Sequence, residues 1–327
     1  MAAIPPSFDL AAYLARIGLP PLEIESLSPA DSLAFLHRVV THHRTAIPFE
    51  NLAVCGTFPI DPAHVGHAAD RISVDVGHIF QKLVVDRRGG YCFEQNTLLA
   101  VALRACGYDV NTLMSRVAIP VPGASLDEAP RIQLTGLSHL ILLVRLRGSL
   151  STTPLYLCDV GFGGRGQPPC PLLLDETPIV AAQGGEVYQL RHVTIQRTVT
   201  STSPLGEFYV VDKADKADDN PIMWGVYYQT QKDGEFHPGY VFSTAHSVVQ
   251  AEVSSANWNT STNPSSFFTQ IPVVVKRTDA GLFTLHDTTF KHIEHGQVVE
   301  SRIIDSHDKL IAVLRDTFGL HAPKLDQ

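Results

Sequence analysis

Apolar residues recur at helical spacing through the first third of the chain. An apolar repeat that ends at Gly18 predicts a first short helix. Ser28-Pro29 with Asp31 is typical of a second helix N-terminus: serine can cap, proline fits the first turn, and the acid meets the positive end of the helix dipole. A third helix is expected over about 92–105, closed by Gly107.

From about Val110 the apolar period shortens to that of strands. The expected strands cover residues 110–119, 139–146, 155–160, 186–201 and 207–213. Residues 211–221 form a charged, breaker-rich loop that we expect to be solvated. Residues 266–287 read as a hairpin with its turn at 279–281, and 305–318 as a closing helix. Helices, then strands, then mixed elements predict an α+β protein in three regions.

Charge and length exclude some classes of function. The 327 residues carry a formal net charge of -8, with a pI near 6.0. No basic field is available to attract nucleic acid or an anionic membrane, so neither is expected as a partner. Length alone suggests about two domains.

The five cysteines are scattered and include no CxxC pair, so neither a zinc ribbon nor a dithiol redox centre is expected. The N-terminus lacks a basic patch followed by an apolar run, so no signal peptide is expected. The apolar run Leu137–Val144 is too short to span a bilayer. We therefore expect a cytoplasmic protein, in which the glycosylation match at 259–261 is idle.

One cysteine lies in a distinctive setting, the stretch RRGGYCFEQN at residues 87–96. At a helix N-terminus, unpaired N–H groups and the dipole would favour the thiolate of Cys92 and could stabilise an oxyanion. Gly89 and Gly90 would allow unusual backbone shapes and close approach of a substrate. The two arginines either add positive charge or pair with the acidic stretch PFEN. The alternative is that Cys92 is a buried core residue.

A nucleophilic thiol needs a histidine to take its proton and a group that orients the histidine. His139 begins an apolar strand, and Asp159 ends the next strand along the chain. If these strands pair, the two side chains lie side by side. Each residue alone has an ordinary explanation, as a surface histidine or a turn-forming acid, but the order Cys-His-Asp is more specific.

Four stretches together resemble the arylamine N-acetyltransferases: RRGGYCFEQN, TGLSHLILLV, CDVGFGG and IPFENL. The resemblance extends over nearly the whole chain. It implies a helical domain (1–108) that carries the cysteine, a central antiparallel β-barrel (109–243) that carries histidine and aspartate, and an α/β lid (244–327). It also implies a cysteine-protease-like Cys-His-Asp core, which falls on Cys92, His139 and Asp159.

The resemblance implies ping-pong transfer of an acetyl group, in a family associated with xenobiotic metabolism. Acetyl-CoA, or another acyl-CoA, would be a co-substrate, with no tightly bound cofactor and no metal. The acceptor would be an arylamine, an arylhydrazine or a similar amine. The natural amine, the preferred acyl group and the oligomeric state stay open.

The same resemblance assigns contacts to several small or aromatic residues. CoA contacts are expected at Thr135, Gly136, Asn259 and Ser265, and substrate contacts at Phe49, Phe93 and Ser138. Ordinary turn chemistry for the small residues and core packing for the two phenylalanines are the alternatives. The chain departs from the family pattern over residues 206–240 and in its short C-terminal end GLHAPKLDQ, which leaves pocket size open.

Other kinds of site were weighed against this one. The GxGxxG match at 161–166 is followed by QPPCP, which cannot open the helix that a dinucleotide site needs. His292 and His295 are close in sequence, but no carboxylate motif completes a zinc site. Two alternatives remain: a Cys-His-Asp hydrolase or transglutaminase-like acyl transferase, and a binding protein that retains the fold without catalysis.

Overall fold

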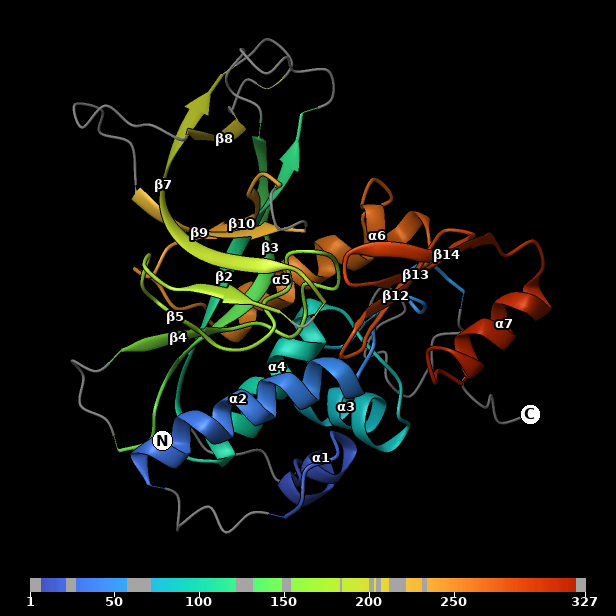
Figure 1. Ribbon diagram of the computed structural model, residues 1–327, viewed down its shortest axis with the longest axis horizontal. Helices are drawn as coiled ribbons and strands as arrows, with labels where there is room; N and C mark the ends of the chain where they lie inside the picture. Colours follow the sequence, from blue (N-terminus) through green and yellow to red (C-terminus); the bar gives the residue numbers. More distant parts are fainter. Residues whose placement is uncertain are drawn as a thin grey trace.

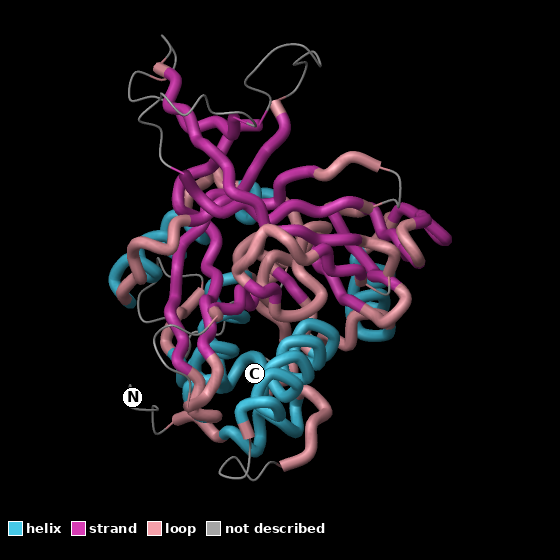
Figure 2. The backbone as a smooth tube through the Cα atoms, turned by 60° about the vertical axis from the view of Figure 1, so that its left-hand side comes forward, coloured by secondary structure: helices cyan, strands magenta, loops and turns pink. Residues whose placement is uncertain are grey.

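The helices of the first third of the chain lie together at one end of the molecule, and the sheets, with the later helices beside them, occupy the rest (Figures 1 and 2). The computed structural model describes residues 7–21, 28–57, 72–121, 132–148, 154–182, 184–199, 203, 207–211, 222–230 and 234–321. The helices are α1 (Leu10–Arg16), α2 (Pro29–Ala46), α3 (Val76–Phe80), the π-helical turn η3 (Gln81–Val85), α4 (Cys92–Ala105), α5 (Gln250–Thr262), α6 (Phe267–Gln270) and α7 (His307–Asp316).

Local sequence sets where the first helices begin and end. The Ser28 side chain accepts from the N–H of Asp31, and a proline occupies the first turn of α2, as expected. Asp9 caps α1 in the same way, and Gly18 follows that helix with φ of 75°. Residues with free backbone shape or capping oxygens therefore mark these boundaries, and α4 spans Cys92–Ala105 as predicted.

In the part of the chain that the structure describes, the larger sheet has nine strands and is antiparallel. They are β2 (Asp109–Pro120), β3 (Ile132–Arg145), β4 (Leu155–Cys158), β5 (Leu172–Leu173), β6 (Ile179–Ala181), β7 (Val187–Thr198), β8 (Glu207–Val211), β9 (Ile222–Gln229) and β10 (His237–Phe242). The pairing runs β2-β10-β9-β7-β8-β3, and β3 also pairs with β2. The hydrogen-bonded circuit of these six strands therefore closes on itself, with β4 and β5 extending from β3.

The smaller sheet combines a strand from the first third of the chain with strands from its C-terminal part. Its strands are β1 (Phe49–Glu50), β11 (Val273–Arg277), β12 (Gly281–His286), β13 (Thr289–Glu294) and β14 (Gln297–Ile303). They follow the order β1-β11-β12-β13-β14, so a strand from the helical region forms one edge of a C-terminal sheet. The hairpin turn after Arg277 is where the sequence predicts it.

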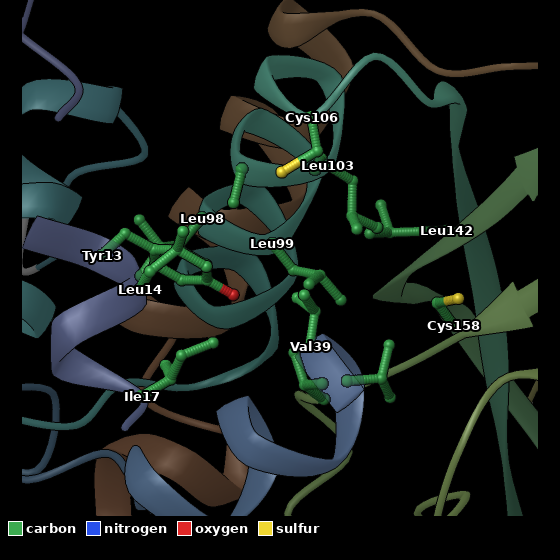
Figure 3. Close-up of a cluster of buried hydrophobic side chains, with 14 of the residues drawn as sticks. Tyr13, Leu14, Ile17, Val39, Leu98, Leu99, Leu103, Cys106, Leu142 and Cys158 are labelled. Atoms are coloured by element: carbon green, nitrogen blue, oxygen red, sulfur yellow. The ribbon is translucent and has the colours of Figure 1, made fainter. Parts of the chain in front are cut away.

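Helix α4 forms the centre of the main core and packs against β2 and β3. Figure 3 shows Leu98, Leu99 and Leu103 of α4 between Tyr13 on one side and Leu142 on the other. These side chains are almost fully buried. Because α4 is apolar on several faces, it is held from all sides, and its first residue is fixed in space.

The structure confirms an α+β protein with the predicted order of helices and strands. Sequence patterning missed α3, η3, β13 and β14, and it included α6 in the expected hairpin. It also missed α5, β9 and β10, which lie in or after the stretch that matched no family motif. The predicted charged loop continues beyond β8 into residues 212–221, which lie outside the described residues.

We predict that Leu99→Ala lowers the free energy of unfolding by about 2–5 kcal/mol, because the deleted side chain leaves a cavity inside the core. Leu137→Ala is the matched control: Leu137 is 49% exposed, and its truncation is expected to cost about 0.5 kcal/mol or less. Urea unfolding followed by circular dichroism measures both. Equal losses in the two variants would contradict this account of the core.

Candidate active site

Three elements bring the expected cysteine, histidine and aspartate together. Cys92 is the first residue of α4, His139 lies on β3, and Asp159 directly follows β4. Strands β3 and β4 are antiparallel, with Leu142 opposite Cys158, so His139 and Asp159 lie at the same end of the strand pair. The chain order Cys-His-Asp is thus converted into one spatial group.

The three side chains are buried and in contact. The Nε2 atom of His139 lies 2.8 Å from Oδ2 of Asp159. The thiol of Cys92 is close enough to the imidazole of His139 to help raise the pKa of the ring. The thiol sulfur also lies 3.8 Å from the carbonyl oxygen of Ser138. With Nε2 directed at the carboxylate, Nδ1 is the nitrogen left to exchange a proton with sulfur.

Asp159 is held by groups that also fix α4. Its Oδ1 accepts from Nδ2 of Asn96 at 2.9 Å and from the N–H of Gly161 at 2.8 Å. Asn96 further donates to the carbonyl of Leu140 at 2.7 Å and accepts from the N–H of Val160 at 3.0 Å. One amide therefore ties α4, β3 and the segment after β4 to the carboxylate.

Gly161 allows this segment to lie directly on the start of α4. A Cβ placed there would be 2.7 Å from Cα of Cys92 and 2.9 Å from Nδ2 of Asn96. The first of these atoms is backbone and cannot move aside easily. The glycine after the aspartate is therefore required by space, at the point where the aspartate and cysteine segments touch.

The electrostatics favour a charged histidine. Burial disfavours the imidazolium, but the charge and hydrogen bond of Asp159, together with Cys92, outweigh it and raise the pKa of His139 to about 10. Burial likewise tends to raise the pKa of Asp159, yet His139, Asn96 and Gly161 lower it below its ordinary value. The site can therefore hold an imidazolium between a carboxylate and the thiol sulfur.

Two aromatic rings enclose the imidazole. The ring centroid of His139 lies 5.1 Å from that of Phe162 and 4.9 Å from that of Tyr240, both edge-on. Tyr240 is fully buried, and burial with the nearby charge of Asp159 raises its pKa well above the ordinary value. Such packing excludes water from one face of the ring and fixes its orientation.

The two glycines before Cys92 have a different role from the expected one. A Cβ on Gly89 would lie 2.3 Å from the carbonyl oxygen of Pro48, and one on Gly90 would lie 2.6 Å from Oε2 of Glu94. The residue with φ in the left-handed region is Arg87, at 54°. The expectation of unusual glycine backbone was thus wrong. The glycines are needed because neighbouring chain segments pack tightly against them.

The structure also shows whether Arg87 and Arg88 add positive charge at the cysteine or pair with the acid of PFEN. Nη2 of Arg88 lies 3.2 Å from Oε1 of Glu50, the acid of PFEN, whereas Arg87 is exposed. Lys82 bridges Glu50 at 3.7 Å and Glu94 at 2.7 Å. This buried network ties the arginine-glycine loop and the first turn of α4 to β1. Its role is to position the loop, because its charges pair with one another.

Expected CoA and substrate residues occur on an irregular part of β3. The register of β3 against β2 shifts twice in this stretch, next to His139. Oγ1 of Thr135 accepts from the N–H of Val117 at 2.9 Å and lies 2.9 Å from Oγ of Ser138. Gly136 is exposed, and a Cβ there would meet no atom within 4 Å. Of these residues, Ser138 lies beside the sulfur through its carbonyl, and the contacts of all three with CoA or an amine stay predictions.

The other two expected CoA residues lie at the end of α5. Asn259 is exposed and its Oδ1 accepts from Nδ2 of Asn263 at 3.3 Å. Ser265 is exposed, and its N–H donates to Oδ1 of Asn263 at 2.9 Å. Their local bonds are ordinary turn chemistry, which leaves both side chains open to solvent.

The two expected aromatic residues differ in their surroundings. Phe49 packs against Gly163, where a Cβ would lie 2.5 Å from its ring, and its ring centroid is 6.0 Å from that of Phe268. Phe93 is fully buried and packs edge-on against Tyr91. Phe49 therefore borders the loop after Asp159, whereas the packing of Phe93 is that of a core residue.

Sequence reasoning assigned no role to Asn96, Phe162 or Tyr240. Asn96 could have been found, because the residue four positions after Cys92 lies on the same face of the helix. Phe162 follows Asp159 within the quoted CDVGFGG stretch. Tyr240 lies in the segment without an anchoring motif, so only the fold places it beside His139.

The described residues also bear on the rejected sites. No helix follows Gly161–Gly166, so the phosphate-binding geometry of a dinucleotide fold is lacking there. Nε2 of His292 pairs with Glu294 at 3.2 Å. No group of three or more potential metal ligands occurs in the part of the chain that the structure describes. Within the same residues, no helix combines the length and apolar character needed to cross a membrane.

Comparison with known proteins agrees with this geometry. A family model described as N-acetyltransferase matches residues 32–325. The arylamine N-acetyltransferase of Mycolicibacterium smegmatis is 30% identical over 315 residues, which cover 96% of this chain and 92% of that protein. This chain belongs to the arylamine N-acetyltransferase family. It is thus a member of an acyltransferase family.

Two further relatives show how wide the family is. The N-malonyltransferase FDB2 of Fusarium pseudograminearum is 29% identical over 293 residues, which cover 83% of this chain and 75% of that protein. The structure of the Mycobacterium marinum arylamine N-acetyltransferase in complex with CoA has a TM-score of 0.68 and 26% identity, and the match covers 95% of this chain and 92% of that one.

We predict that stability falls with rising pH because of His139. Its pKa is about 10 in the folded protein against an ordinary 6.5, so across this window the folded state holds more protons than the unfolded state. Unfolding therefore becomes easier as pH rises through the window, with a slope of at most about 1.4 kcal/mol per pH unit from this residue. Below pH 6.5 the stabilisation is complete.

Asp159→Asn should flatten this slope, because the carboxylate that raises the pKa of His139 is removed. Asp305→Asn is the control, since that exposed carboxylate titrates far below the window. Free energies of unfolding between pH 6 and pH 10 measure the effect. A slope that Asp159→Asn leaves unchanged would refute the assignment.

Proposed function

We propose that this protein transfers an acetyl group from acetyl-CoA to an arylamine, an arylhydrazine or a similar amine through an acetyl-cysteine intermediate. The observation that carries the proposal is the buried contact of His139 with Asp159 at 2.8 Å, with the thiol of Cys92 close enough to the same ring to help raise its pKa. Family membership supports the acyl-CoA donor, because a relative is known in complex with CoA.

In the first half-reaction, the sulfur of Cys92 attacks the thioester carbonyl carbon as its proton rests on Nδ1 of His139. The C–S bond to CoA breaks, and the CoA sulfur leaves as a thiol with the proton from the imidazolium. In the second, the amine nitrogen attacks the acetyl-cysteine, His139 accepts its proton, and the Cys92 sulfur leaves. Asp159 stabilises the imidazolium throughout.

The start of α4 suits the charge that develops in both steps. The first N–H groups of a helix have no acceptor within the helix, and here they surround the nucleophile itself. The carbonyl of Tyr91 accepts from the N–H groups of Glu94 and Gln95, one turn on. We propose that the N–H groups of Cys92 and its neighbours stabilise the tetrahedral oxyanion.

The domain boundaries 1–108, 109–243 and 244–327 are part of the proposal. The closed circuit of six strands supports a central β-barrel, and the five-stranded sheet with α5 and α7 supports a C-terminal lid. The sheet pairing of β1 with β11 would link the first and third units. A cytoplasmic location stays a prediction, which the five free cysteines suit.

The central test is to incubate the protein with several acyl-CoA thioesters and look for transfer of the acyl group to Cys92. We expect incubation with acetyl-CoA, without amine, to add one acetyl group to Cys92, as seen by intact-protein mass spectrometry and peptide mapping. Malonyl-CoA belongs in the panel because one relative is an N-malonyltransferase. Cys92→Ala should abolish the adduct and amine acetylation. Cys106→Ala and Cys170→Ala should retain most activity, because burial raises the pKa of both thiols and keeps them protonated.

A stable adduct that later passes to an amine distinguishes this reaction from hydrolysis. Loss of the acetyl group to water at the same rate with and without amine would favour the hydrolase reading. Absence of any adduct, with Cys92 no more reactive to iodoacetamide than an ordinary thiol, would favour the non-catalytic binding protein.

We expect Asp159→Asn to fold yet lose activity by a factor of about 10⁴, because an amide cannot stabilise the imidazolium. The measurement is kcat for acetylation of an arylamine across pH 6 to 9, with Asp175→Asn as a control at an exposed carboxylate. Wild-type activity in Asp159→Asn would remove aspartate from the mechanism.

A further inference from the structure

A cavity of about 240 Å³ is lined by none of Cys92, His139 and Asp159. Its walls come from α2, the loop after Asp159, the turn between β6 and β7, and the turn between β11 and β12. Three arginines line it, Arg44, Arg165 and Arg277, against two carboxylates, Glu186 and Asp279. Of these, Arg165 and Asp279 are exposed and lie at the rim.

The inner carboxylate is already committed to one arginine. Oε2 of Glu186 lies 3.2 Å from Nη1 of Arg277 and also accepts from the hydroxyl of Tyr188 at 2.6 Å. Arg277 donates further to Gln167 at 3.3 Å and to the carbonyl of Gly164. The charge of Glu186 is therefore balanced before Arg44 is counted.

Arg44 has a guanidinium with one side occupied and the other free. Its Nη1 donates to the carbonyl of Pro169 at 3.0 Å. Its Nε is buried, and among the described residues it has no hydrogen-bond partner. Nε and Nη2 form the planar edge that grips a carboxylate or a phosphate with two parallel bonds. The protein leaves that edge without an acceptor.

Among the described residues, the carboxylate whose charge acts on Arg44 is Glu186, and it is already paired with Arg277. Burial and then the nearby Arg277 lower the pKa of Arg44 to about 10, so the guanidinium remains charged at neutral pH. Cys170 lines the same cavity, but burial raises the pKa of its thiol despite Arg44, so the thiol stays protonated. Arg44 is half-buried, but its Nε is buried, so leaving that N–H without an acceptor is costly and a bound anion would remove the cost.

We propose that this cavity binds a small oxyanion, a carboxylate or a phosphate group, on the Nε–Nη2 edge of Arg44. The hydroxyl of Thr278 adds a second donor, since its oxygen accepts from the N–H of Gly281 at 3.0 Å and its proton is left to donate. The site borders the loop that carries Gly164, whose carbonyl accepts from Arg277, and Cys92 does not line it. The proposal is independent of the proposed reaction.

The first test is thermal unfolding with increasing potassium phosphate or potassium malonate, at ionic strength held constant with potassium chloride. We expect a rise in Tm that saturates at about 2 °C or more with one of the two anions. The anion that acts at lower concentration tells phosphate from carboxylate. No rise beyond chloride with either anion would overturn the proposal.

Variants test whether the anion-dependent rise in Tm depends on Arg44. Arg44→Gln should fold with a Tm close to or above that of wild type without anion, because a half-buried guanidinium whose Nε has no acceptor is removed, and should lose the anion-dependent rise. Arg44→Lys keeps the positive charge but lacks the planar edge, and it should lose most of the anion-dependent rise in Tm. Arg315→Gln, at an exposed arginine on α7, is the matched control and should respond like wild type. An equal rise in Arg44→Gln would refute the site.

A second measurement needs no variant. Cys170 and Cys55 are both free and partly exposed, but Cys170 alone lines the cavity. The effective anion should slow carbamidomethylation of Cys170 by iodoacetamide at least about twofold at saturation, since bound anion occupies the cavity. The rate at Cys55 should not change. Peptide mapping resolves the two thiols, and unchanged rates at both would count against the proposal.

Discussion

The contact between His139 and Asp159 is the interaction on which the rest of this structure depends. Both side chains are almost fully buried, and each ion taken alone would be costly to remove from water. The cost is met because Asp159 also accepts from Asn96 and from the N–H of Gly161. A buried pair of this kind is tolerated only where several segments converge at fixed distances, which is what β3, β4 and α4 provide.

That requirement explains the close approach of backbone around the site. The segment after Asp159 rests on α4 at Gly161, and the loop before α4 rests on Pro48 at Gly89. In both places any side chain would collide with backbone atoms. The dense apolar packing along the rest of α4 then prevents its first turn from retreating. Small residues at the contacts and large residues behind them act together to hold Cys92 against the imidazole.

Much of this could be predicted from sequence, because the signals are local. The limits of α4, the cap at Ser28 and the strand bearing His139 follow from periodicity and breakers, and the family stretches named the three polar residues. Helix α5 was missed because its inward residues include Asn257, Thr260 and Ser261, which give no apolar stripe. The roles of Asn96, of the glycines and of Arg44 depend on contacts between distant segments, which no local pattern records.

The two faces of the imidazole suggest how reactants approach. One side is closed by Phe162 and Tyr240, which both pack on the imidazole. The ring centroids of these two residues lie 5.1 Å from each other. The other borders the irregular stretch of β3, where exposure changes abruptly: His139 is 2% exposed and Leu137, two residues away, is 49% exposed. A regular strand would place those two side chains on the same face, so the register shift creates this boundary. Donor and acceptor would therefore meet the sulfur along the shifted stretch, and its shape would influence which acyl groups and amines can react.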